Sequence, residues 1–103
     1  MAKEKLTPAD KKFIAKFFGE VNFGSELITR SNRFTGETVE VDPVTALMFD
    51  FIMKLDQAMQ MRTDRAVQSV HPDLKLSNAI MNFDRARMIA LKMNSNAYMT
   101  LLD

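Results

Sequence analysis

The stretch from Arg30 to Pro43, "RSNRFTGETVEVDP", decides the fold, because it is the one segment whose residue pattern is not helical. Residues 27–34 and 37–42 carry β-branched side chains with a period of two, which is typical of half-buried strands. Thr35-Gly36 lies between them, and glycine supplies the positive φ of a tight hairpin turn. The stretch therefore predicts a β-hairpin; an anion held by the turn amides is the alternative interpretation.

Helical patterns lie on both sides of this hairpin. The first helix begins at Thr7-Pro8, where a hydroxyl can cap the helix and a proline needs no amide partner. Apolar residues then recur at helical spacing, and we expect Gly24 to end the helix. The second helix begins at Asp42-Pro43 in the same way and is expected to run to about Arg62.

The rest of the chain also has a helical pattern. Residues 62–70 are expected to extend the second helix until Pro72 ends it. A third helix covers about residues 77–94, with Ser77 as its cap, and a short helical turn follows over residues 95–102. The sequence therefore predicts a mainly α fold, at the margin of α+β, with three to four helices. One β-hairpin lies between the first and second helices, and residues 1–103 form a single domain.

Composition excludes several classes of protein. The 103 residues carry a formal net charge of +1 and no cysteine, which argues against a strongly basic nucleic-acid binder and excludes disulfides and thiolate metal sites. The N-terminal residues lack the apolar core of a signal peptide, and the longest uncharged apolar run, residues 43–49, is too short to cross a bilayer. We expect no membrane insertion, no secretion by a classical signal, and a location in the cytoplasm or within a macromolecular assembly.

The residue types that usually carry catalysis are few and scattered. The three glycines do not form a phosphate-binding loop. His71 and Asp73 could form a base with its orienting carboxylate, but the local sequence favours a structural or exposed histidine. Asp50 and Asp56 do not converge on one face of their helix. The sequence therefore predicts no catalytic residue, no metal site, no cofactor and no small-molecule substrate.

The helices carry more apolar surface than one core needs. On the second helix, Phe49 and Met53 lie one turn apart among polar residues, opposite the main apolar arc. On the third helix, Met81 and Met88 belong to a second apolar arc. The chain contains nine methionines, a residue that suits adaptable binding surfaces. These four residues are predicted to bind another protein.

Charged and projecting residues complete this predicted interaction surface. Asp84 and Arg87 are spaced to pair on the third helix and would fix the register of a partner. Arg33, Phe34 and Thr35 form the hairpin tip, which we expect to reach a neighbouring subunit as an arm. Together these features predict a non-catalytic component of an oligomer or larger complex: an adaptor, an inhibitor or a structural subunit such as a virion protein.

The alternative function is that of a small nucleic-acid-binding regulator. Asn82, Arg85 and Lys92 lie on one stripe of the third helix, and their side chains suit contacts with phosphates and base edges. Arg30 and Arg33 of the hairpin would support them. This hypothesis requires that these basic groups are available to an outside partner.

Overall fold

The computed structural model describes residues 5–21, 24 and 26–102. The elements are α1 (Pro8–Phe18), β1 (Ile28–Ser31), β2 (Thr38–Val41), α2 (Pro43–Gln60), α3 (Asp64–Val70), α4 (Leu76–Met93) and α5 (Ser95–Leu102). The mainly helical fold with one antiparallel hairpin is confirmed, but the described residues form five helices rather than three to four.

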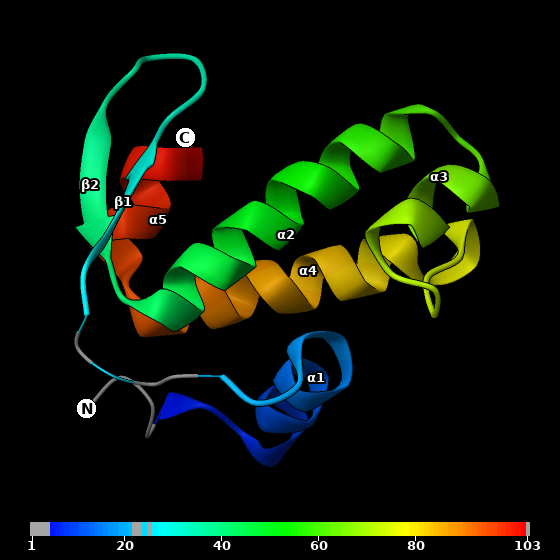
Figure 1. Cartoon of the computed structure of the whole chain (residues 1–103), viewed down its shortest axis with the longest axis horizontal. Helices are drawn as coiled ribbons and strands as arrows, with labels where there is room; N and C mark the ends of the chain where they lie inside the picture. The colour runs from blue at the N-terminus through cyan, green and yellow to red at the C-terminus, as the bar shows by residue number, and fades with distance from the viewer. Residues whose placement is uncertain (1–4, 22–23, 25, 103) are drawn as a thin grey trace.

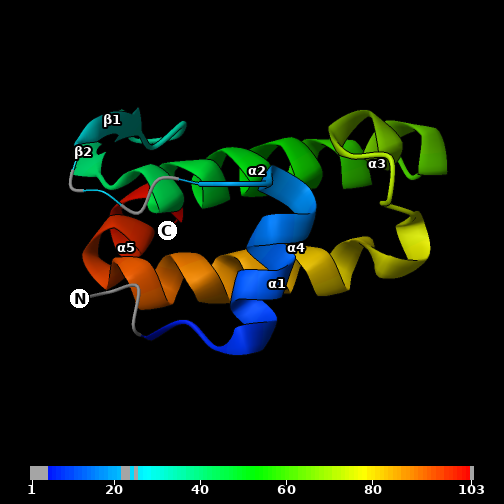
Figure 2. The same cartoon turned by 60° about the horizontal axis from the view of Figure 1, so that its bottom comes forward.

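The long helices α2 and α4 pack along each other and form the centre of the molecule. The hairpin and α5 lie at one end of this pair and α3 lies at the other end (Figure 1). Helix α1 crosses the pair from one side (Figure 2). The core between these helices includes Met48, Leu55 and Ile89, none of which is measurably exposed. Among the described residues, no helix combines the length and the apolar character that a membrane span requires.

Helix α1 ends earlier than predicted. Gly19, rather than Gly24, terminates it with a φ of 69°, a left-handed conformation that glycine adopts without the penalty of a Cβ. The start is as predicted: the Thr7 side chain accepts the N–H of Asp10, while the Asp10 carboxylate accepts the N–H of Thr7. This reciprocal capping box places a carboxylate inside the first helical turn.

Residues 62–70 do not continue α2, contrary to the prediction. Arg62 adopts a φ of 57°, which breaks the helix directly after Gln60 and Met61. Thr63 then caps a separate helix, α3, by accepting the N–H of Ala66 at 3.1 Å. The predicted extension is therefore a helix of its own that folds back on α2.

Helix α4 also begins differently from the prediction. It starts at Leu76, and Ser77 does not serve as its cap. The Asp64 carboxylate of α3 accepts the first N–H, that of Leu76, at 2.8 Å. The side chain of Asn78 accepts the N–H of Lys75 at 2.9 Å, so a tertiary and a local contact together replace the predicted Ser77 cap.

The hairpin pairs Ile28 with Val41 and Ser31 with Thr38. The Asn32 N–H donates to the carbonyl of Glu37 at 2.8 Å, so the loop proper comprises residues 33–36. This corrects the predicted tight turn at Thr35-Gly36: only Gly36 needs its positive φ, of 77°. As expected for two strands that are marginal alone, the sheet packs on helices, here α5 and α2.

A second, smaller core lies under the hairpin, and it corrects the interpretation of Phe49. This side chain is only 7% exposed. It packs with Val41 of β2 and with Ala97 and Leu101 of α5, so the chain itself covers the apolar face that we had assigned to a partner. Met53, one turn further along α2, is half-buried between the two cores.

Candidate interaction surface

All exposed side chains of α4 lie on one face of the helix, here named the α4 face. Its members are Leu76, Ser77, Ile80, Met81, Asp84, Arg87, Met88 and Leu91. Ile80 is 68% exposed, Met81 70% and Met88 53%, whereas Ala86 and Ile89 on the opposite side are buried in the main core. A helix face with several large, exposed apolar side chains is typical of a protein-binding site.

An ion pair occupies the middle of the α4 face. A nitrogen of Arg87 (Nη1) donates to the Asp84 carboxylate at 3.2 Å, which confirms the predicted pairing. The Arg87 Nε also donates to the Tyr98 hydroxyl of α5 at 3.0 Å, and this bond raises the pKa of Arg87 above its ordinary value. The guanidinium group is therefore held in a defined orientation at the surface.

A hollow of about 330 Å³ opens beside the α4 face, where α2, α4, α5 and the hairpin loop meet. Its lining residues are Arg33, Ile52, Met53, Asp56, Phe83, Arg87, Tyr98 and Leu102. The structure thus gathers Met53, Arg33 and Arg87 at one place, although they come from three different elements. Helix α5 also lines the hollow, through Tyr98 and Leu102. The sequence did not predict this contribution, because neither residue belongs to a recognisable motif.

The hairpin tip combines a fixed residue with an open one. Arg33 donates to the Asp56 carboxylate of α2 at 3.2 Å, and its guanidinium carbon lies 4.7 Å from the centre of the Phe34 ring. Phe34 itself is 80% exposed. The Thr35 hydroxyl accepts the N–H of Glu37 at 3.2 Å. The loop is therefore held against α2, and Phe34 is the part of it that projects.

Asn32 positions this loop, and sequence reasoning overlooked it. Its side-chain oxygen accepts the N–H groups of Phe34 at 2.7 Å and Thr35 at 3.0 Å. Its side-chain nitrogen donates to the carbonyl of Thr100 in α5 at 2.9 Å, and the residue is only 2% exposed. The available signal was an asparagine at the end of a predicted strand, a common position for such turns. Its bond to Thr100 had no local signal.

We expect the substitution Asn32→Ala to lower the free energy of unfolding by about 2 kcal/mol, because it removes three partly buried hydrogen bonds, to the N–H groups of Phe34 and Thr35 and to the carbonyl of Thr100. Urea unfolding followed by circular dichroism measures the difference. Asn96→Ala, at an exposed position of α5, is the control and should change stability by less than about 0.5 kcal/mol. Equal stabilities of the two variants would contradict this role of Asn32.

The basic residues of the alternative hypothesis are engaged within the chain. Arg30 donates to both carboxylate oxygens of Asp50, at 2.9 and 2.8 Å, and this hydrogen bonding raises the pKa of Arg30. The side-chain amide of Asn82 donates to the carbonyl of Asn78 at 2.9 Å. The Arg30–Asp50 contact attaches the hairpin to α2, and the Asn82 amide is hydrogen-bonded within its own helix, α4.

Arg85 and Lys92 both bind the Asp10 carboxylate of α1, at 3.1 and 2.6 Å. Asp10 has no measurable exposure. Its burial would raise its pKa, but the hydrogen bonds from Lys92, the Thr7 backbone and Arg85 outweigh this effect and lower the pKa from 3.8 to about 2. Arg85 and Lys92 therefore fix α1 on α4, while their side chains stay 41% and 27% exposed.

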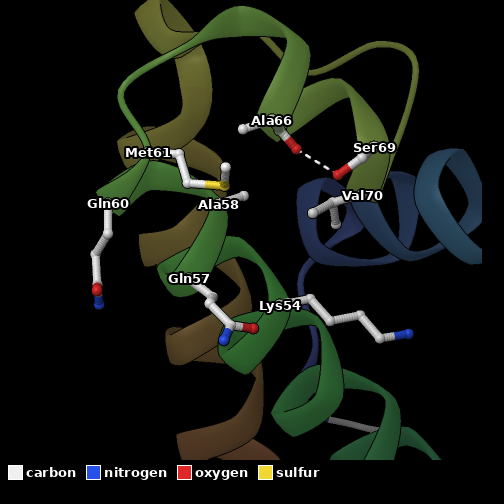
Figure 3. A pocket seen from close by; sticks show the side chains of 8 residues that line it. All are labelled: Lys54, Gln57, Ala58, Gln60, Met61, Ala66, Ser69 and Val70. Carbon is white, nitrogen blue, oxygen red and sulfur yellow. Dashed lines mark hydrogen bonds between the residues drawn. The ribbon is translucent and has the colours of Figure 1, made fainter.

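Another hollow, of about 580 Å³, lies between the C-terminal end of α2 and α3 (Figure 3). Among the described residues that line it, Lys54 is the only ionisable one, and the Ser69 hydroxyl donates to the Ala66 carbonyl of its own helix. His71 accepts the N–H of Asp73 through Nδ1, and its ring lies 4.6 Å from that of Phe17. Within the described ranges, no three histidines, cysteines or carboxylates are grouped so as to hold a metal.

In comparisons with known proteins, no protein-family model, curated protein or solved structure matches this chain. The function must therefore be argued from the arrangement of its own residues.

Proposed function

We propose that this protein is a non-catalytic interaction or assembly component that works in an oligomer or larger complex. The observation that carries the proposal is the α4 face, on which Ile80, Met81 and Met88 are all more than half exposed along a regular, well-packed helix. Exposure of apolar side chains to water is unfavourable, and burial of these side chains against a partner would lower the free energy. An adaptor, an inhibitor and a structural subunit, such as that of a virion, all use surfaces of this kind.

The chemistry of the α4 face supports recognition of a protein partner. Methionine side chains are flexible and polarisable, so they adapt to the shape of a second surface. The oriented Asp84–Arg87 pair supplies a polar contact of fixed geometry at the centre. Phe34, at the hairpin tip, provides a further exposed aromatic group of the type that is enriched at interfaces.

The proposal is tested by size-exclusion chromatography with light scattering, on the purified protein alone and after mixing with lysate of its native cells. The 11.8 kDa chain should elute in a species heavier than the monomer in at least one condition. The double variant Met81→Gln/Met88→Gln should weaken that association at least about thirtyfold, because polar amides replace the buried thioethers.

A matched control makes this result specific to the α4 face. Met61 and Met99 are 69% and 54% exposed but lie on other parts of the surface. The variant Met61→Gln/Met99→Gln should associate like the wild type. A wild-type protein that stays monomeric in both conditions, or a control variant that loses association equally, would refute the assigned role.

A further inference from the structure

We propose that two copies of this chain associate by antiparallel contact of their α4 faces, with Asp84 of each copy opposite Arg87 of the other. This inference deepens the proposed function by naming the partner, a second copy, and it rests on that function. It follows from the spacing, the charge order and the exposure of residues along α4.

The α4 face has the spacing of a helix–helix seam. Ser77, Ile80, Asp84, Arg87, Leu91 and Asn94 follow one another at alternating intervals of three and four residues. This interval pattern places side chains along the line by which two helices contact each other in coiled coils. The first five are exposed, and Asn94 is half-buried where α4 ends. These residues therefore form a continuous line along α4, and the two at its centre, Asp84 and Arg87, remain 56% and 46% exposed.

The seam is self-complementary about its midpoint, between Arg85 and Ala86. An antiparallel two-fold arrangement places Ile80 opposite Leu91 of the partner subunit and Asp84 opposite Arg87 of the partner subunit. Each apolar residue then meets an apolar one, and each charge meets its opposite. A parallel arrangement would instead place Asp84 beside the partner's Asp84, which like-charge repulsion disfavours.

The methionines fit the same arrangement. Met81 and Met88 both lie along one flank of the seam. At a rise of 1.5 Å per residue, the two-fold operation brings Met88 to within about 3 Å, along the helix axis, of the level of the partner's Met81. Two methionine pairs would therefore close one side of the interface, and their flexible side chains can adjust to each other.

Arg87, at the centre of the seam, can bind a second carboxylate. A guanidinium group has five N–H donors. Arg87 uses Nε for Tyr98 and Nη1 for Asp84 of its own chain, so donors remain for a second carboxylate. Asp84 and Arg87 are 56% and 46% exposed, which allows the two intrachain pairs to merge into one network of four charges across the two-fold axis.

Charge reversal tests this register by sedimentation equilibrium of the purified protein. Asp84→Arg places four arginines at the centre of the dimer, and Arg87→Asp places four aspartates there. Each variant alone should dimerise at least about a hundredfold more weakly than the wild type. An equimolar mixture of the two should dimerise again, because each arginine of one variant then faces an aspartate of the other.

Two controls accompany this experiment. Asp73→Arg makes the same charge change at an exposed position outside the α4 face and should leave dimerisation unchanged. Circular dichroism should show equal helix content and similar thermal unfolding for all variants, since the reversed residues are exposed.

The outcomes separate this inference from the proposed function. A wild type that is monomeric up to about 100 µM, or single variants that dimerise normally, would overturn the antiparallel dimer. Failure of the mixture to dimerise would overturn it as well. If the monomeric wild type still captured a lysate protein through Met81 and Met88, the proposed function would stand without the dimer.

Discussion

Replacing Phe49 with alanine is expected to lower the free energy of unfolding by about 4 kcal/mol. Phe49 is 7% exposed and fills the second core, where β2, α2 and α5 meet. The substitution removes a buried ring and leaves a cavity between three elements that cannot all close onto it. Since a domain of this size is typically stable by only about 5–15 kcal/mol, the variant would lose a large share of its stability.

Chemical unfolding monitored by circular dichroism measures this loss, and Phe34→Ala is the matched control. The control makes the same substitution at a residue that is 80% exposed, so its stability should change by less than about 0.5 kcal/mol. If Phe49→Ala instead kept full stability and lost only binding to another protein, Phe49 would be an interface residue after all.

Replacing Asp10 with alanine is expected to cost about 3 kcal/mol of stability. The variant loses the half of the capping box in which the Asp10 carboxylate accepts the Thr7 N–H, and it removes the common partner of Arg85 and Lys92, which fix α1 on α4. The cost is moderated because these two cations are 41% and 27% exposed and can be hydrated again. Asp56→Ala, which breaks an exposed ion pair with Arg33, is the control and should cost about 0.5 kcal/mol.

The pH dependence of unfolding tests the same contact independently. The pKa of Asp10 is about 2 in the folded chain and near 3.8 when the carboxyl is unperturbed, so the unfolded state binds its proton more readily. The stabilisation by the charged carboxylate, about 2 kcal/mol, is complete above about pH 5 and is lost progressively as the pH falls to the folded pKa of about 2. The stability difference between wild type and Asp10→Ala should therefore shrink over this interval. A constant difference would contradict the lowered pKa.

Local signals in the sequence predicted much of the fold. Thr7-Pro8 and Asp42-Pro43 marked the starts of α1 and α2, because capping and proline geometry act within one turn. The ends were harder to predict. Gly19 could be tolerated inside a helix or could end it, and the positive φ of Arg62 has no signal in the residue type. Part of the capping of α4 comes from Asp64, twelve residues before Leu76, and is a product of tertiary packing.

The same distinction applies to the interaction surface. The pairing of Asp84 with Arg87 was predictable because residues three apart on a helix are neighbours. Helical periodicity also separated Phe49 from the main apolar arc, but it could not show which segment covers that second face. The answer lies in α5, about fifty residues later in the chain. Asn32 was overlooked for the same reason, since its bond to Thr100 spans 68 positions.

The position of α5 in the chain has a consequence for protein synthesis. The hairpin, the second core and the Asn32–Thr100 hydrogen bond all need residues 95–102, and these residues leave the ribosome after every other element described here. Until then, Phe49 and the inner face of β2 are exposed on a nascent chain whose other helices have already emerged. During this interval the uncovered apolar face promotes aggregation, and the packing of α5 ends that exposure.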